Sequence, residues 1–553
     1  MDSGAFISGA PHGESGASIS IAAVLRQAFT FHQSGRLQEA LELYRQVFTA
    51  QPNDVDALNF GGVAAFQSGD AEQGVKLLQT AVTLKPDYVD AHNNLGNVLK
   101  ALGELDGAEA AYRRALEIKP DYVDAHYNLG ILLELVGKLD EAAAAYRQSV
   151  EIKPNFSEAH FNLGNVLKPL GKLDEAVDAY GRALELKPDH ADAHNNLGSA
   201  LYELGKFDEA VAAYRGALGI KPDHADAHYN LGVALQELGK LDEAIAAYHS
   251  ALTIKPSYAA AHVNLGYALK QLGKLDEAVA AYRRAIAIEP DHAPAHSNLG
   301  DVLLERGDPR AAIEVCDAFL KDHPGNSGVL AFKAIALDEL GERASVRFLV
   351  DFDRFIQPTK LRAPAGFASL ADFNAALARH VCAHPTLVFA PTRHATRLGK
   401  HSGELLVGPK GPVAVLERMI RGAVEDYVRS LPADPTHPFV ANQPQHLTLT
   451  AWGIVLEAQG HQIPHVHPSA WLSGVYYVKL PDVVSTPGQG QAGWIEFGRP
   501  PAHFHSTVEP DVRAFQPEEG LMLLFPSYFY HRTVPFETAG TRISISFDIR
   551  PLD

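Results

Sequence analysis

The chain has 553 residues, of which 46% are hydrophobic, and its formal net charge at neutral pH is −18. This length exceeds what one hydrophobic core supports, so two or more domains are expected. The negative charge argues against general nucleic-acid binding, because a surface that follows phosphate groups should be basic. No run of 18 or more apolar residues occurs, so no membrane span is predicted. The two cysteines, Cys316 and Cys382, argue against a disulfide framework and favour a reduced, cytoplasmic protein.

The chain begins with a segment that does not read as structured. Residues 1–18 are rich in Gly, Ser and Ala, with neither a basic start nor an apolar stretch. A secretory signal peptide needs both of these features. Residues 1–18 are therefore predicted to be a disordered N-terminus.

A repeat with a period of 34 residues fills the first half of the chain. Proline recurs at positions 52, 86, 120, 154, 188, 222, 256, 290 and 324. The template between prolines reads AHxNLGxxLxxLGKLDEAxAAYRRALEIKP, which fits two helices joined by a turn with Gly, with Pro after the second helix. Small residues at fixed positions predict close helix contacts: Gly96, Gly130, Gly164, Gly198, Gly232, Gly266 and Gly300 on the first helix, and Ala108, Ala142, Ala176, Ala210, Ala244, Ala278 and Ala312 on the second.

This template resembles the tetratricopeptide repeat. The resemblance implies an all-α solenoid of nine repeats over residues 19–324. A capping helix is expected around Gly328 to Leu340, which places the whole repeat domain at residues 19–345.

Asparagine recurs at one position of the first helix in each repeat: Asn94, Asn128, Asn162, Asn196, Asn230, Asn264 and Asn298. First helices line the concave face of such solenoids. The column is similar to the asparagine ladder of O-linked N-acetylglucosamine transferases, where side-chain amides hold the backbone of an extended polypeptide. An amide offers both a donor and an acceptor to a peptide group, so the column is a candidate peptide-binding surface. The alternative is that the asparagines bridge neighbouring repeats.

Histidine forms a second column, at His92, His126, His160, His194, His228, His262 and His296. Neighbouring members lie a whole repeat apart, so packing is expected rather than metal binding. The resemblance to the transferases ends with the repeats, because about 210 residues remain after Leu340 and they contain no Gly-rich nucleotide-binding signature. Sugar transfer is therefore disfavoured.

The composition changes after about residue 345, and residues 346–553 are expected to form a separate domain. Apolar residues from Leu416 to Tyr427 trace one face of an amphipathic helix. Short strand-like runs separated by turn residues follow, at residues 447–456, 472–479, 493–497, 521–525 and 542–549. This pattern predicts a double-stranded β-helix (jelly roll), so the fold class of the whole chain is α+β and multidomain.

Three histidines in this region could hold one metal ion. His465 and His467 stand two apart, next to a strand-like run, so their side chains face the same way. His531 follows an apolar run and a Pro-Ser turn, and could supply a third ligand. Arg542 and Ser544 share one face of a strictly alternating segment. A metal ion with open positions beside a fixed cation suits a small anionic cosubstrate.

The motifs HVHPSAWLSGVYYVKLP, GLMLLFPSYFYH and RISISF resemble a bacterial family of 2-oxoglutarate/Fe(II) oxygenases, in matching order. The resemblance covers roughly residues 345–553. It implies Fe(II) on His465, His467 and His531, and 2-oxoglutarate bound by Arg542. Ser544 could add a hydrogen bond to 2-oxoglutarate, and so could one of the two tyrosines Tyr476 and Tyr477. Tyr477 is taken as the candidate, and Tyr476 stays open as the alternative. The function implied is hydroxylation of a substrate recruited by the repeats, for which a polypeptide is the simplest choice.

One position departs from the broader superfamily, which uses two histidines and one carboxylate, because His467 occupies the carboxylate position. Three histidines with an open position also suit catalytic zinc. Two alternatives therefore stay open: a three-histidine zinc or cupin-type enzyme, and a non-catalytic interaction scaffold with a degenerate barrel. A further pair, His503 and His505, falls in an expected loop and is disfavoured as a metal site.

Overall fold

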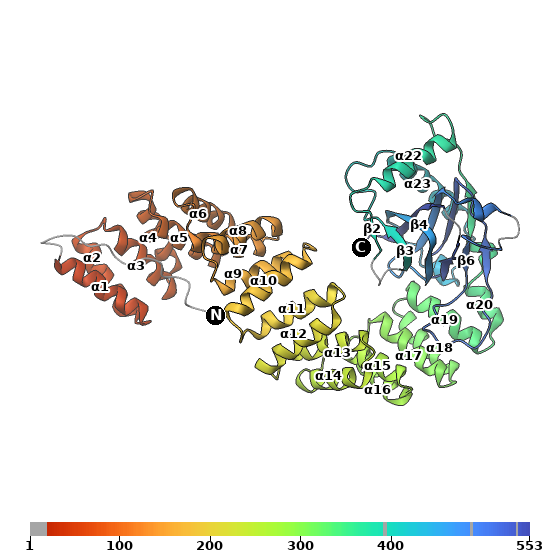
Figure 1. The fold of residues 1–553 in the computed structure, drawn as a ribbon, viewed down its shortest axis with the longest axis horizontal. Coiled ribbons are helices and arrows are strands. Elements are labelled where there is room, and N and C mark those ends of the chain that lie inside the picture. Colours follow the sequence, from red (N-terminus) through yellow and green to blue (C-terminus); the bar gives the residue numbers. More distant parts are fainter. Residues whose placement is uncertain (1–18, 391–394, 487–489, 538–539, 553) are drawn as a thin grey trace. The chain divides into compact units, whose positions relative to one another are not determined.

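The computed structural model describes residues 19–390, 395–486, 490–537 and 540–552. The predicted disordered N-terminus, residues 1–18, lies outside this range. The chain divides into two compact units, Met1–Ile254 and Lys255–Asp553, and the repeats continue from the first into the second. Figure 1 shows paired helices through the repeats and a curled sheet in the C-terminal part.

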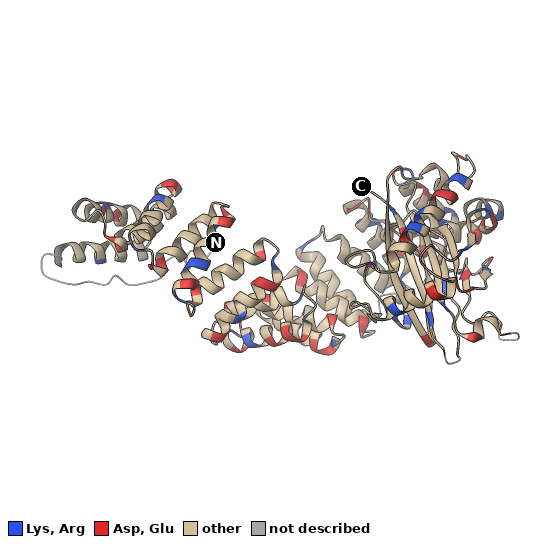
Figure 2. Ribbon diagram, turned by 90° about the horizontal axis from the view of Figure 1, so that it is seen from above, with Lys and Arg blue, Asp and Glu red and all other residues tan. Residues whose placement is uncertain are grey.

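The first unit consists of paired repeat helices. Their bounds are α1 Ile19–Gln33, α2 Leu37–Ala50, α3 Val55–Gln67, α4 Ala71–Leu84, α5 Val89–Ala101, α6 Leu105–Ile118, α7 Val123–Leu135, α8 Leu139–Ile152, α9 Ser157–Leu167, α10 Leu173–Leu186, α11 Ala191–Glu203, α12 Phe207–Ile220, α13 Ala225–Glu237 and α14 Leu241–Ile254. Figure 2 shows acidic and basic residues distributed along the repeat helices. The predicted pairing of helices, two per 34 residues, is confirmed.

From α5 onward in this unit, each pair is held by a glycine on the first helix that contacts a tyrosine on the second. A Cβ atom at Gly164 would lie 2.6 Å from the Tyr180 ring, so only glycine admits this contact. The predicted alanine column is fully buried at every position from Ala108 to Ala312. The turn inside each repeat also needs glycine, as at Gly137, where φ is +76°.

The second unit begins with the last repeat helices and the cap. These are α15 Ala259–Gln271, α16 Leu275–Ile288, α17 Ala293–Glu305, α18 Pro309–Leu320, α19 Ser327–Glu339 and α20 Arg343–Leu349. Helix α19 lies where the sequence analysis expects a helix after the last repeat, and its role as a cap stays a prediction. It supplies Phe332, whose ring packs against Gly300 in the place that tyrosine takes elsewhere.

The C-terminal part is a single antiparallel sheet with supporting helices. The helices are α21 Phe352–Phe355, α22 Leu370–Cys382, α23 Val413–Ser430 and α24 Pro438–Ala441, with a short 3-10 turn at Asp482–Ser485. The strands are β1 Gln357–Lys360, β2 Val388–Phe389, β3 Thr396–His401, β4 Leu447–His465, β5 Leu472–Lys479, β6 Ile495–Phe497, β7 Arg513–Phe515, β8 Leu521–Pro526, β9 His531–Thr533 and β10 Arg542–Pro551. Their order is β1-β8-β5-β10-β4-β9-β6-β7, and β3 also pairs with β4 and β2. The predicted jelly-roll class is confirmed.

Strand β4 is longer than the sequence indicates. The expected strand ended at Leu456, but pairing continues to His465 after an irregular stretch in which Gln459 has φ +67°. A shift of register against β3 accompanies this stretch, which interrupts the alternation of apolar residues. The extension places His465 directly opposite His531 on β9.

Candidate metal and cosubstrate site

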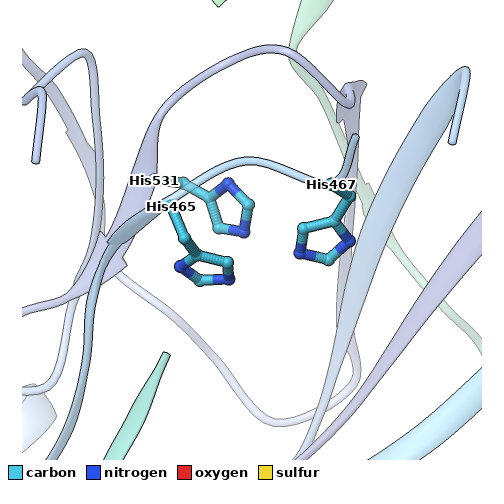
Figure 3. A group of neighbouring side chains, drawn as sticks. All are labelled: His465, His467 and His531. Carbon is cyan, nitrogen blue, oxygen red and sulfur yellow. The ribbon is translucent and has the colours of Figure 1, made fainter. Parts of the chain in front are cut away.

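The three predicted histidines converge. His465 ends β4, His467 follows two residues later, and His531 begins β9. One ring nitrogen of each lies within 4.8 Å of the corresponding nitrogens of the other two. Figure 3 shows the three rings turned toward a common point. Within the described part of the chain, this is the one group of three or more potential metal-ligating side chains.

Hydrogen bonds fix which nitrogen of each ring is available. The Nδ1 atoms of His465 and His531 lie 2.8 Å and 3.0 Å from the carbonyl oxygens of Ile463 and Phe529. Nδ1 of His467 lies 2.5 Å from Oδ1 of Asp548. A carbonyl or carboxylate oxygen accepts only, so each Nδ1 carries the hydrogen and each Nε2 keeps its lone pair. The rings are thereby oriented as metal ligands usually are.

Burial keeps two of these rings neutral. Removal from water, with the neighbouring His467 adding to it, lowers the pKa of His465 to about 3. The pKa of His531 lies well below its usual value because of burial and because His465 and His467 are close. Neutral imidazole is the form that binds a metal ion, so little free energy is lost to deprotonation at neutral pH.

Asp548 belongs to the site and was missed by the sequence analysis. Its carboxylate is buried, and it accepts hydrogen bonds from His467 and, at 2.8 Å, from Ser473 Oγ. Burial opposes the charged form, but His467 and Ser473 outweigh it and hold the pKa of Asp548 below its usual value. The alternation that placed Arg542 and Ser544 on one face of β10 continues to Asp548, so the sequence pattern already predicts that Asp548 lies on the same face.

Arg542 is buried without an anionic partner. Its side chain is 2% exposed, and Nη1 donates to Ser544 Oγ at 3.3 Å. The guanidinium carbon lies 5.1 Å from the centre of the Tyr477 ring. Among the residues that the structure describes, no carboxylate forms an ion pair with Arg542, and its Nε has no hydrogen-bond partner. Burial lowers the pKa of Arg542, although arginine stays charged at any physiological pH.

The histidines and Arg542 line the same cavity. Its volume is about 260 Å³, and its wall also includes Trp452, Ser546 and Asp548. A buried cation without a counter-ion is costly, so the cavity is suited to an anion that enters from outside. Ser546, on the same strand face as Arg542, lines the cavity, whereas the predicted Ser544 and Tyr477 contact Arg542.

The two candidate tyrosines point in different directions. The Tyr476 hydroxyl donates to Oδ1 of Asn374 at 2.6 Å, on helix α22. Tyr477 lies beside Arg542, and burial raises its pKa to about 12. Of the two, Tyr477 is therefore the one placed to support Arg542.

The asparagine column links neighbouring repeats. Asn94, Asn128 and Asn230 each donate from Nδ2 to an asparagine Oδ1 35 residues earlier, at 2.9–3.0 Å. Asn162 donates to the Tyr127 hydroxyl at 3.3 Å, and Asn196 donates to Asn165 at 3.0 Å. Asn94 and Asn128 are buried. This geometry is the bridging that the sequence analysis gave as an alternative. Peptide binding by Asn94, Asn128, Asn162, Asn196, Asn230, Asn264 and Asn298 stays a prediction.

The histidine column supports the turns between repeats. Nε2 of His92, His126, His160, His194, His228 and His262 lies 2.8–3.1 Å from the carbonyl oxygen of the proline six residues earlier. His503 and His505 lie between β6 and β7 and belong to no metal-ligating group in the described ranges. The six histidines of the column thus contact the backbone of the turn that precedes their helix.

Family models match the repeats and part of the C-terminal domain. Residues 450–548 match the family model described as "Putative 2OG-Fe(II) oxygenase". Residues 62–103, 96–137, 136–171, 164–205, 198–239, 234–273 and 266–307 match a TPR repeat model, and residues 25–54 match a second tetratricopeptide-repeat model. The chain thus matches models of tetratricopeptide repeats and, over residues 450–548, a model of this oxygenase family. Among the described residues, no helix is both long and apolar enough to cross a lipid bilayer.

Solved structures of repeat proteins are similar to parts of the chain. MamA is 30% identical over 30% of this chain and 96% of its own, with a TM-score of 0.29. YrrB, described as "a TPR protein with an unusual peptide-binding site", is 26% identical over 34% of this chain and 96% of its own, with a TM-score of 0.31. Pseudomonas aeruginosa pilF is 21% identical over 38% and 96%, with a TM-score of 0.34. The search of curated proteins found no match. None of these matches tests the likeness to the transferase repeats.

Proposed function

We propose that the chain is an Fe(II)- and 2-oxoglutarate-dependent dioxygenase that hydroxylates a polypeptide recruited by its repeats. The observation that carries this proposal is Arg542. A buried guanidinium without an ion-pair partner in the described residues lines the same cavity as three converging histidines. A dicarboxylate that binds the metal ion at one end and Arg542 at the other satisfies both features.

The donor set fits Fe(II). His465, His467 and His531 would hold the ion through their Nε2 atoms, because each Nδ1 is already hydrogen-bonded. When bound there with 2-oxoglutarate, Fe(II) supplies the O2 chemistry that oxidises a C–H bond while 2-oxoglutarate gives succinate and CO2. The chain's own contribution is positional: Asp548 orients His467, and Arg542 fixes the far carboxylate of 2-oxoglutarate by charge-assisted hydrogen bonds.

None of the three candidate metal ligands is a carboxylate, but a carboxylate is hydrogen-bonded to the ring of one of them. Asp548 accepts a hydrogen bond from Nδ1 of His467, so its negative charge would make the His467 ring a stronger electron-pair donor to a bound metal ion. This supports a working iron site despite the departure from two histidines and one carboxylate. A three-histidine zinc enzyme would use the same ligands, yet it gives Arg542 no evident role. A non-catalytic scaffold would leave Arg542 buried with no anion.

A polypeptide substrate is proposed because tetratricopeptide repeats present a long concave surface that can hold an extended chain. The net charge of −18 supports a protein partner over nucleic acid. The cysteines Cys316 and Cys382 are both free thiols, which supports a reducing, cytoplasmic setting.

The test separates metal binding from cosubstrate binding in the full-length protein. Iron content and 2-oxoglutarate affinity are measured anaerobically for the wild type, His531→Ala and Arg542→Ala. His531→Ala should lose the metal ion. Arg542→Ala should keep it but bind 2-oxoglutarate about 10-fold to 100-fold more weakly, since a hydrogen bond to a charged group contributes roughly 1.5–3 kcal/mol. A wild type that holds iron but does not bind 2-oxoglutarate would refute the dioxygenase proposal.

A further inference from the structure

Within the second unit, a segment of the C-terminal domain lies against the last repeat helices. Residues 503–508, here called the strap segment, belong to the connection between β6 and β7. Three helices contact it in turn: α15 through Lys270, α17 through Asp301, and α19 through Glu339. These are first helices of their pairs, the helices that line the inner face of a repeat solenoid.

The contacts are made mainly by the backbone of the strap segment. Lys270 Nζ donates to the carbonyl oxygen of His503 at 3.1 Å, and the His505 N–H donates to Oδ1 of Asp301 at 2.6 Å. The N–H groups of Thr507 and Val508 both donate to Oε1 of Glu339. The N–H groups of residues 505 and 507 both face the helices, as alternate residues of an extended peptide do, and the turn before them is closed by the Phe504 N–H, which donates to the carbonyl oxygen of Pro501 at 3.1 Å. Hydrogen bonds of this kind recognise a polypeptide by its main chain.

Two side chains add selectivity. The Phe504 ring lies 5.2 Å from the ring of Phe332, which is itself fully buried on α19. The Thr507 hydroxyl donates to Oε2 of Glu339 at 2.7 Å. An aromatic residue three positions before a hydroxyl residue is therefore the chemistry that this surface accepts.

Of the polar residues that hold the strap segment, Asp301 alone is particular to its repeat: no acidic residue occupies its position in the other repeats, whereas Glu339 has a matching Glu one repeat earlier and Lys270 has a matching Lys three repeats earlier, at Lys168. One repeat earlier, the positions of Lys270, Asp301 and Glu339 are occupied by Gln236, Tyr267 and Glu305. With the strap segment in place, Asp301 is 3% exposed, and it also forms an ion pair with Lys270. A buried carboxylate that faces a backbone N–H is arranged to bind a main chain.

The strap segment is not embedded in a solid core. Ser506 and Val508 form part of the wall of a second cavity of about 890 Å³, and Ser506 and Thr507 are exposed. Polar contacts made largely by an exposed backbone can open without unfolding the sheet behind them.

We propose that α15, α17 and α19 form a binding surface for an extended polypeptide, which the strap segment occupies and which a polypeptide of matching chemistry takes over by displacing it. This proposal deepens the proposed function by naming the partner's pattern, Phe-x-x-Thr or its equivalent, and it rests on that function only for the fate of the bound chain. The apparent affinity for an external peptide is reduced by the fraction of molecules in which the strap segment is docked.

The test uses a fluorescent synthetic peptide with the sequence of residues 500–510 and the full-length protein, followed by fluorescence anisotropy. Phe504→Ala weakens the strap segment and leaves every repeat residue intact, so it should bind the peptide about tenfold more tightly than the wild type. Thr507→Val removes one hydrogen bond and should give a smaller gain. Val512→Ala, in the same connection but beyond the contacts, should match the wild type. A peptide with Ala in place of its Phe should bind every protein more weakly.

A second set of variants tests the location. Glu339→Ala combined with Phe504→Ala should abolish the gain in affinity, because three donors of the peptide lose their acceptor. Circular dichroism melts show whether each protein is folded. If Phe504→Ala does not fold, the comparison is made with Thr507→Val. Equal, undetectable binding by the wild type and both strap variants would overturn the proposal and leave the strap segment as a permanent clamp. Equal binding with and without Glu339 would also overturn it.

These readouts do not depend on the metal site. None of the substituted residues lines the cavity that contains the histidines. Iron and 2-oxoglutarate binding, measured on the same samples, therefore test only the dioxygenase proposal. The anisotropy measurements test only whether an external peptide displaces the strap segment.

Discussion

Removing the negative charge of Asp548, which is hydrogen-bonded to His467, should weaken metal binding although all three histidine ligands remain. Asp548 Oδ1 accepts from both His467 and Ser473, so Asp548→Asn can keep both hydrogen bonds through its remaining oxygen and lose only the charge. Asp548→Ala loses both bonds. The pair of variants separates the electrostatic effect of Asp548 from its role in orienting the ring.

The magnitude follows from the two kinds of bond. A charge-assisted hydrogen bond is roughly twice as strong as a neutral one, which makes the difference for Asp548→Asn about 1 kcal/mol, or about fivefold in metal affinity. Loss of an outer-shell partner typically lowers metal affinity about 10-fold to 100-fold, which is the expectation for Asp548→Ala. The two variants should therefore rank in that order below the wild type.

The assay is an anaerobic competition between the protein and a chromophoric chelator for Fe(II), repeated with Zn(II). Ser546→Ala is the matched control, because Ser546 lies on the same strand face and lines the same cavity, and no hydrogen bond links it to a histidine in the described residues. Thermal melts exclude a loss of folded protein as the cause. Wild-type affinity in Asp548→Ala would refute the reasoning that Asp548 orients His467.

Three further predictions test other parts of the molecule. Arg542→Lys keeps the charge but loses the planar fork and the bond to Ser544, so 2-oxoglutarate affinity should fall about tenfold at unchanged iron content, measured by anaerobic titration; equal affinity would mean that the fork is not used. Gly164→Ala should lower the stability of the repeats by about 1–3 kcal/mol in a denaturant melt, since its Cβ would lie 2.6 Å from the Tyr180 ring, whereas Gly181→Ala, with open space around it, should not. Replacing Asn162, Asn196, Asn230 and Asn264 together by Ala should reduce capture of a partner polypeptide in a pull-down and also lower the melting temperature, because at least three of these amides bridge repeats; capture at the wild-type level would remove the support for peptide binding by the column.

The sequence predicted the repeats well because their signal is local and recurs. A 34-residue period with Gly and Ala at fixed positions defines both helices and their contact, and the structure places them accordingly. The longer jelly-roll strands that are bounded by turn residues, such as β5 and β10, were also predicted at nearly their observed bounds. Strands of two to four residues, such as β2 and β9, are too short for any period to be visible and owe their existence to pairing.

The candidate site was partly accessible in the same way. The three histidines and Arg542 could be named because their residue types are unusual beside apolar strands. Asp548 was not singled out, because its place beside His467 depends on the pairing of β10 within the sheet and on the hydrogen bond between the two side chains. The direction of the asparagine amides could not be derived either, since it depends on the spacing between adjacent repeats.

That spacing couples the extension of the first unit to the hydrogen bonds between its repeats. Each bridging amide joins one repeat to its immediate neighbour, so the bonds act in series along the solenoid. A peptide backbone that took over these amides would exchange a bond between repeats for a bond to itself. The pitch of the solenoid and the occupancy of its inner face would then vary together, and stretching the repeats would alter how firmly they hold a chain.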